Sequence, residues 1–138
     1  DVIEGDGPYG DFVFKDDMAS EIVLIAGGSG IAPLMSMLRY VIAKKLETTV
    51  SLIYSSKTKE LVTYEKELQE CHDVKHCTVH HVLTQEGNER INKETLLPFT
   101  KHTPLYFICG PPDMVNHCVD LLKNLGVTLD RIRTERYA

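Results

Sequence analysis

An apolar run at residues 22–26 passes directly into a turn that contains Gly27, Gly28 and Gly30. The run predicts a strand buried on both faces, because its side chains are aliphatic and do not alternate with polar ones. Glycines allow backbone angles and close approaches that a side chain would forbid. Pro33 fits the first turn of a helix, where its missing N–H is no loss. The order of strand, glycine turn and helix predicts bare backbone amides at a helix N-terminus, which suits a pyrophosphate.

The turn departs from the standard dinucleotide-binding fingerprint, Gly-x-Gly-x-x-Gly. From Gly28 it reads Gly-x-Gly-x-x-Pro, so that Pro33 stands where the third glycine would be. Two interpretations are therefore open, a nucleotide-binding loop and an ordinary tight turn. A P-loop is excluded, because no Gly-Lys-Ser/Thr follows the glycines.

Strands and helices alternate along the rest of the chain. Strands are predicted at residues 22–26, 50–54, 79–83, 105–109 and 131–135. Apolar residues at helical spacing predict a helix after Pro33, and further helices at residues 60–71, 94–99 and 113–125. In the second of these helices Leu61, Tyr64 and Leu68 would share one apolar stripe. The pattern predicts an α/β fold, a Rossmann-like parallel sheet of about five strands with helices on both faces.

Three segments of unusual composition fall at the carboxyl ends of predicted strands. They are residues 27–33, 55–57 and 110–112. Ligands of open parallel sheets lie beyond the carboxyl ends of the strands, where the strand order switches. The sequence therefore predicts one binding rim at this edge of the sheet.

Composition narrows the class of protein. At 138 residues the chain is the size of one domain. A net charge of −5 without a basic run argues against nucleic acid as a partner, and no apolar segment approaches the ~20 residues that span a membrane. The first residues lack the features of a signal peptide and the chain does not begin with Met, which suggests a fragment or a processed product. The spacing of Cys71, Cys77, Cys109 and Cys118 indicates free thiols and a cytoplasmic protein.

Four segments, in order along the chain, resemble the NAD(P)-binding domain of the ferredoxin–NADP reductase and cytochrome b5 reductase superfamily of flavoproteins. Residues 28–33 match the family's Gly-Thr-Gly-Ile-Ala-Pro, with Ser29 in place of threonine. Residues 109–112 match its Cys-Gly-Pro-Pro. Residues 7–12 resemble the Gly-Pro-x-Gly-x-Phe segment that ends the family's flavin barrel, and residues 134–137 resemble its final strand.

The resemblance implies a domain organisation and a reaction. Residues 1–15 would be the last strand of a missing flavin-binding β-barrel, and residues 19–138 the NAD(P)-binding domain. No Arg-x-Tyr-Ser motif, which the family's barrel uses to hold flavin, is found in the chain. The module would pass hydride from NAD(P)H to FAD held mainly by an absent N-terminal domain, and electrons would go on to an iron–sulfur, haem or oxygenase partner. The alternative is a non-catalytic nucleotide-binding or interaction domain that retains the fold.

The resemblance also implies three catalytic residues, and each has a plainer structural interpretation. Cys109 would orient the nicotinamide ring, or it is a small buried apolar side chain at a strand end. The Ser29 hydroxyl would point at the nicotinamide and flavin, or it caps a helix. Glu135 would help with proton balance near the same place, or it is a solvated charge. The full set of residues expected to bind cofactor is Gly27, Gly28, Ser29, Gly30, Ile31, Ala32, Pro33, Ser55, Ser56, Lys57, Tyr64, Cys109, Gly110, Pro111, Pro112, Met114 and Tyr137.

The end of the second predicted strand bears on the choice of coenzyme. NAD sites often place an acid there for the ribose diol, whereas NADP sites place cations around a 2′-phosphate. This chain has Ser55, Ser56 and Lys57, and no acid before Glu60. Lysine binds phosphate as a point charge, which favours NADP over NAD, although Lys57 is also compatible with an exposed turn. FAD is expected as a second cofactor of the full-length protein.

Histidines and cysteines gather between residues 71 and 81. These residue types suit zinc, but their spacing matches no standard zinc finger or ribbon. His80 and His81 are adjacent in a predicted strand, so they would point to opposite faces of the sheet. A polar surface around a turn is the better interpretation, and no metal site is predicted.

Overall fold

The computed structural model of the chain describes residues 3–6 (backbone only), 12, 14, 19–72, 76–85 and 90–137. The strands are β1 (Ile3–Asp6), β2 (Glu21–Gly27), β3 (Thr49–Ser56), β4 (Cys77–Leu83), β5 (Leu105–Gly110) and β6 (Ile132–Tyr137). The α-helices are α1 (Ile31–Ala43), α2 (Glu65–His72), α3 (Lys93–Leu96) and α4 (Pro112–Asn124). Short 3₁₀ turns are η1 (Gly28–Gly30), η2 (Lys59–Leu61), η3 (Leu97–Phe99) and η4 (Leu129–Arg131).

All six strands form one sheet in the order β1-β6-β5-β2-β3-β4. Strands β6, β5, β2, β3 and β4 run parallel to one another. The chain builds β2, β3 and β4 outward in one direction and then crosses back to place β5 and β6 on the other side of β2. The strand order therefore switches at β2, and the predicted α/β fold with five parallel strands is confirmed.

Strand β1 adds an edge that the fold prediction did not include. It pairs antiparallel with β6, with Ile3 opposite Tyr137. These residues fall within residues 1–15, which were assigned to the barrel of another domain, and that domain assignment stays a prediction. Of the Gly-Pro-x-Gly-x-Phe segment at residues 7–12, only Phe12 lies within the described residues, and its ring packs edge-on against Phe107.

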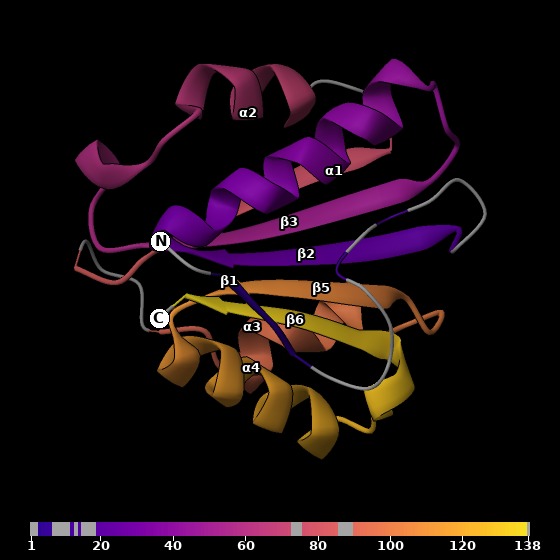
Figure 1. Ribbon diagram of the computed structural model, residues 1–138, viewed down its shortest axis with the longest axis vertical. Coiled ribbons are helices and arrows are strands. Elements are labelled where there is room, and N and C mark those ends of the chain that lie inside the picture. The colour runs from indigo at the N-terminus through magenta and orange to yellow at the C-terminus, as the bar shows by residue number, and fades with distance from the viewer. Residues whose placement is uncertain are drawn as a thin grey trace.

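Helices cover both faces of the sheet, with α1 and α2 on one face and α3 and α4 on the other (Figure 1). Successive side chains of β2 point to opposite faces of the sheet, and both faces are covered, which explains why its sequence is apolar throughout. Ile22, Leu24 and Ala26 pack in the cluster beneath α1, whereas Val23 and Ile25 pack in the cluster beneath α4. All five side chains are essentially inaccessible to solvent, as predicted for a strand buried on both faces.

The helix predicted over residues 60–71 is wrong in its first part. Residues 59–61 form η2, and α2 begins only at Glu65. Leu68 is buried as expected, but Leu61 is 58% and Tyr64 39% exposed, so the three residues share no buried stripe. The buried Tyr54 hydroxyl accepts a hydrogen bond of 3.2 Å from the backbone N–H of Thr63. This contact takes a donor that a continuous helix would need, and it keeps residues 62–64 out of the helix.

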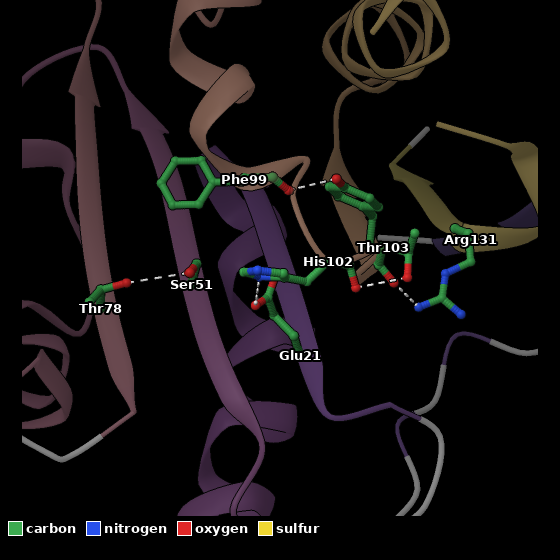
Figure 2. Close-up of polar contacts among 8 residues, drawn as sticks. Glu21, Ser51, Thr78, Phe99, His102, Thr103 and Arg131 are labelled. Atoms are coloured by element: carbon green, nitrogen blue, oxygen red, sulfur yellow. Dashed lines mark hydrogen bonds and ion pairs between the residues drawn. The ribbon is translucent and has the colours of Figure 1, made fainter. Parts of the chain in front are cut away.

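Polar contacts tie together the amino ends of the strands, opposite the rim that the sequence predicts as a binding site. Figure 2 shows that Arg131 reaches the backbone before β5, where its guanidinium donates to the carbonyl of Thr103. The Tyr106 hydroxyl donates to the Phe99 carbonyl at 2.6 Å. Because Tyr106 and Arg131 are used in this way, the amino edge of the sheet is occupied by structural contacts. Within the described part of the chain, no helix has the length and apolar character needed to cross a membrane.

Candidate functional site

The glycine turn η1 is pressed against the end of β5. A Cβ added to Gly30 would lie 2.1 Å from the carbonyl oxygen of Cys109, so no other residue fits without moving the backbone. Gly28 has a left-handed backbone with φ of 54°, and the space around it is open. Ser29 is exposed, and neither η1 nor α1 has a side-chain cap hydrogen bond, so the interpretation of Ser29 as a helix cap is wrong.

The ends of β2 and β5 meet beneath one methionine. A Cβ on Gly27 would lie 2.9 Å from the Met114 sulfur, and one on Gly110 would lie 2.8 Å from the same atom. Gly110 also approaches the backbone of Gly27. Because both strand ends lack side chains, the methionine of α4 can settle against them. Three residues that the sequence assigns to cofactor binding therefore form one floor.

A cavity of about 400 Å³, here named the rim pocket, opens beyond the carboxyl ends of β2 and β3 on the α4 side. It brings together seven of the expected residues: Gly27, Gly28, Ser55, Ser56, Lys57, Pro111 and Met114. Six lining residues were not expected from the sequence: Leu61, Thr84, Arg90, Ile91, His117 and Cys118. This cavity thus lies at the predicted rim and at the switch in strand order, where ligands of such sheets bind.

Arg90 is the most consequential of the missed residues. It follows β4 in sequence and is far from the glycine turn, but β4 pairs with β3, and Thr84 and Arg90 line the same pocket as the end of β3. His117 of α4 holds this segment through a 2.8 Å hydrogen bond between Nε2 and the Ile91 carbonyl. Only the strand order could have revealed Arg90, because it belongs to no motif that we recognised in the sequence.

The charge of the rim pocket is positive. Lys57 and Arg90 line it, and no carboxylate is found among its described lining residues. The N-terminus of α1 follows the glycine turn, and the N-terminus of α4 begins at Pro112, so two helix dipoles add positive potential at this edge. The pocket is therefore suited to an anionic ligand.

A second group of residues lies on the α1 face of the same edge and is here named the Cys109 cluster. It consists of Ser29, Cys109, Glu135 and Tyr137. Cys109 is fully buried and is paired with Glu135 in the sheet register. The Tyr137 hydroxyl donates a 2.7 Å hydrogen bond to the Ser29 carbonyl and lies within hydrogen-bond reach of the Cys109 thiol. The three residues that the resemblance names as catalytic are thus close together.

Burial controls ionisation in the Cys109 cluster. Desolvation, with a smaller contribution from the charge of Glu135, raises the pKa of Cys109 to about 11 despite the opposing hydrogen bond from Tyr137. Desolvation also raises the pKa of Glu135. Since the thiolate is the nucleophilic form of cysteine, a thiol with this pKa is poorly suited to attack a substrate at neutral pH.

The remaining expected residues lie in different places. Ile31, Ala32 and Pro33 form the first turn of α1 next to the glycine turn, and Pro112 begins α4. Tyr64 does not line the rim pocket. Its ring lies under the Arg39 guanidinium instead, 5.3 Å from the ring centroid.

A comparison with known proteins gives the family. A family model described as the oxidoreductase NAD-binding domain matches residues 24–120, which include the glycine turn, the end of β3 and most of α4. The chain belongs to this family.

Curated relatives of this NAD-binding domain are longer proteins. The chain is 33% identical to flavohemoprotein A of Dictyostelium discoideum, over 93% of the chain and 33% of that protein. It is 30% identical to NADH-cytochrome b5 reductase 1 of the same organism, over 97% of the chain and 51% of that protein. A third relative, the uncharacterized oxidoreductase AIM33 of Saccharomyces cerevisiae, is 30% identical over 90% of the chain and 43% of its own length. The chain thus spans between a third and about half of these relatives.

Solved structures show the same fold. The FAD/NAD-binding domain of a nitric oxide dioxygenase from Vibrio cholerae superposes with a TM-score of 0.80 at 22% identity, over 93% of the chain and 55% of that structure. A flavohemoglobin from Malassezia yamatoensis, solved with FAD and heme, gives a TM-score of 0.79 at 27% identity, over 90% of the chain and 33% of that structure. These likenesses place the NAD-binding domain in the ferredoxin reductase-like fold.

The residues present fit a nicotinamide dinucleotide. Gly28 leaves its backbone open to a ligand, and Lys57 and Arg90 supply cations in the same pocket. Ser56, another lining residue, has a buried Oγ without a hydrogen-bond partner in the described structure. Positive charge and open backbone at a helix N-terminus are the features that diphosphates require.

The histidines of β4 are used in packing. His80 packs against Phe99 with 5.0 Å between ring centroids, and His81 lies 5.9 Å from the ring of Tyr54 on the other face of the sheet. This confirms the prediction that the two side chains point in opposite directions. Among the described residues, no cluster of three or more His, Cys, Asp or Glu side chains could hold a metal ion.

Proposed function

We propose that this chain is the nucleotide-binding module of a flavoprotein reductase, and that NADPH is its preferred coenzyme. The observation that carries the proposal is the rim pocket, which contains Lys57 and Arg90 but no carboxylate among its described lining residues. An NAD site of this fold usually offers an acid to the ribose diol, whereas a 2′-phosphate requires cations. Membership of the oxidoreductase NAD-binding family supports the same class of ligand.

The two groups of residues would serve the two halves of the dinucleotide. The adenosine half would occupy the rim pocket, with its 2′-phosphate near Lys57 and Arg90. The amides of η1 and the first turn of α1 would receive the pyrophosphate. The nicotinamide half would then reach the Cys109 cluster, because Ser29 joins the two groups. Gly28, the residue before Ser29, lines the rim pocket, and the Ser29 carbonyl accepts the hydrogen bond from Tyr137.

The side chains of the Cys109 cluster would orient the reacting ring and exclude water. When bound, NADPH supplies a hydride and FAD accepts it, and that chemistry belongs to the cofactors. A protonated Cys109 offers a small polarisable surface without competing as a nucleophile. Glu135, whose pKa is raised by desolvation and which is paired with Cys109 in the sheet, would hold a proton beside it. Ser29 presents an exposed side chain on the turn between both groups.

The flavin and the electron acceptor would come from outside this chain. Relatives named flavohemoprotein and a cytochrome P450 reductase from Amycolatopsis at a TM-score of 0.77 support a flavin domain of the same protein and a haem, iron–sulfur or oxygenase partner. The cysteines of the chain are unpaired and buried, which supports a reducing compartment such as the cytoplasm.

Calorimetric titration with NADP⁺ and NAD⁺ tests the proposal. We expect NADP⁺ to bind about tenfold more tightly, which corresponds to one good charge-assisted phosphate contact. In Arg90→Gln this preference should shrink, while NAD⁺ affinity should change little. Lys123→Gln is the matched control, because Lys123 is an exposed cation at the far end of α4. Equal affinities for the two coenzymes in the wild type would contradict the proposal.

A further inference from the structure

Arg39 of α1 makes two kinds of contact with the beginning of α2. Its Nε and Nη2 atoms donate hydrogen bonds of 2.6 and 2.7 Å to the two carboxylate oxygens of Glu67. Its guanidinium carbon also lies 5.3 Å from the ring centroid of Tyr64, which precedes α2. The planar guanidinium can serve a carboxylate in its plane and an aromatic ring on its face, which an ammonium group cannot do equally well. Arg39 therefore holds Glu67 and Tyr64 together.

The segment that Arg39 holds leads back to the rim pocket. We name residues 57–64 the connector. Lys57 and Leu61 of the connector line the rim pocket, and the Lys57 carbonyl accepts a 2.8 Å hydrogen bond from Gln85 N–H. At its other end, Thr63 is bound to the buried Tyr54 through its backbone N–H and its hydroxyl. The backbone of the connector is thus held at Lys57 and at Thr63, with Leu61 between them and Tyr64, which Arg39 contacts, directly after Thr63.

The last residue of the connector is held in an unfavourable backbone conformation. Tyr64 has φ of 60°, in the left-handed region that residues with a Cβ seldom adopt. Such a conformation persists when the surroundings impose it. Tyr64 is 39% exposed, so packing in the core does not impose this conformation. Its carbonyl accepts a 2.8 Å hydrogen bond from Leu68 N–H of α2, and the Arg39 guanidinium lies over its ring.

We propose that Arg39 is a positioning residue for nucleotide binding, because it holds Tyr64 and the start of α2 and so fixes the connector that presents Lys57 and Leu61 to the rim pocket. Arg39 is not among the described residues that line this pocket. The inference rests on the proposed function, since it adds a residue to the same site. It goes beyond that function because it states that a contact between α1 and α2, on the face of the sheet opposite α4, contributes to nucleotide affinity.

A role in global stability alone would have a different signature. The Arg39 side chain is 51% and the Glu67 side chain 34% exposed, and ion pairs at such positions contribute little to folding free energy. Their loss should therefore change the thermal midpoint only slightly. If Arg39 positions the connector, nucleotide affinity falls by more than this small loss of stability can explain.

The test measures the Kd of 2′,5′-ADP by calorimetry and the thermal midpoint, in the protein at its full natural length. In Arg39→Met, we expect Kd to rise about fivefold, the size of coupling typical of neighbouring groups in one network. Arg39→Lys keeps the charge but loses the paired geometry, and it should raise Kd in the same direction by a smaller factor. Lys44→Met is the matched control. Lys44 makes a similar contact on the same helix, 5.9 Å from the Tyr40 ring, but it does not touch the connector, so its Kd should stay unchanged.

A double-variant cycle separates positioning from a general loss of structure. Lys57→Met should weaken 2′,5′-ADP binding by a smaller factor in the Arg39→Met background than in the wild type, because Lys57 is already misplaced there. Wild-type affinity in Arg39→Met, or equal factors for Lys57→Met in the two backgrounds, would overturn the positioning role and leave the proposed function intact. A wild-type protein that does not bind 2′,5′-ADP would instead overturn both.

Discussion

The hydroxyl of Tyr137 donates a 2.7 Å hydrogen bond to the backbone carbonyl of Ser29, 108 residues earlier in the chain. This contact joins the last strand of the sheet to the glycine turn that follows the central strand. It also covers the buried thiol of Cys109, which lies within hydrogen-bond reach of the same hydroxyl. Tyr137 therefore contacts both the glycine turn and the end of β5.

Removing the Tyr137 side chain should expose Cys109. In Tyr137→Ala we expect N-ethylmaleimide to label Cys109 at least about tenfold faster, because local opening is no longer required before reaction. Tyr137→Phe keeps the ring and should stay close to the wild-type rate. Peptide mapping by mass spectrometry identifies the labelled site, and Cys77, which is buried at the amino end of β4, serves as the internal control. Unchanged labelling of Cys109 in Tyr137→Ala would mean that other groups cover the thiol.

Two glycines of the turn should differ sharply in their tolerance of alanine. Gly30→Ala places a Cβ against the Cys109 carbonyl carbon and oxygen, and we expect a loss of about 3 kcal/mol or more in the free energy of unfolding. Gly28→Ala meets open space and pays only for its left-handed backbone, about 1 kcal/mol. Urea denaturation of both variants measures the difference. Similar losses in the two would show that β5 can retreat from the turn.

Stability should fall at alkaline pH because of buried thiols. Burial raises the pKa of Cys77 and of Cys109 to about 11. Each therefore binds its proton more tightly in the folded state, and the resulting stability is complete below the thiol's ordinary pKa of about 8.5 and is lost as pH rises through 11. We expect the urea midpoint to drop between about pH 8 and about pH 10.5. The drop should be smaller in the double variant Cys77→Ala/Cys109→Ala, and an equal drop would contradict the assignment.

Cys109 should affect hydride transfer more than coenzyme affinity. In the flavin-loaded full-length protein, Cys109→Ala should slow flavin reduction by NADPH about tenfold or more, because small errors in ring placement are costly. Stopped-flow absorbance gives the rate, and its dependence on NADPH concentration gives the affinity, which should stay within about twofold. Cys77→Ala provides the matched control, because Cys77 is a buried cysteine at the amino end of β4 and does not line the rim pocket. A large loss of affinity in Cys109→Ala would show that the thiol belongs to the nucleotide-binding surface.

The sequence predicted correctly those elements whose apolar pattern follows directly from burial against helices. The strand at residues 22–26 is aliphatic because helices cover both of its faces, and its uninterrupted apolar run predicted it to within one residue at each end. The first part of the predicted helix at residues 60–71 failed, because a hydrogen bond from Thr63 to the distant Tyr54 competes with helix formation. No local pattern carries that information.

The same distinction applies to the site. Gly27, Lys57 and Met114 follow strand ends directly, and the rule that ligands bind at carboxyl ends was enough to group them. Arg90 was missed because its place depends on which strands are neighbours. Tyr64 lies under Arg39 and outside the rim pocket, and its assignment to cofactor binding stays a prediction. Residues that reach the site only through the order of strands in the sheet cannot be identified without the structure.

A crystal structure with NADP⁺ at saturating concentration tests the central proposal most directly. The account predicts density for the 2′-phosphate between Lys57 and Arg90 in the rim pocket, the diphosphate against Gly28–Gly30, and the chain of density continuing toward Cys109. Coenzyme bound elsewhere, or a rim pocket that stays empty at saturation, would contradict it.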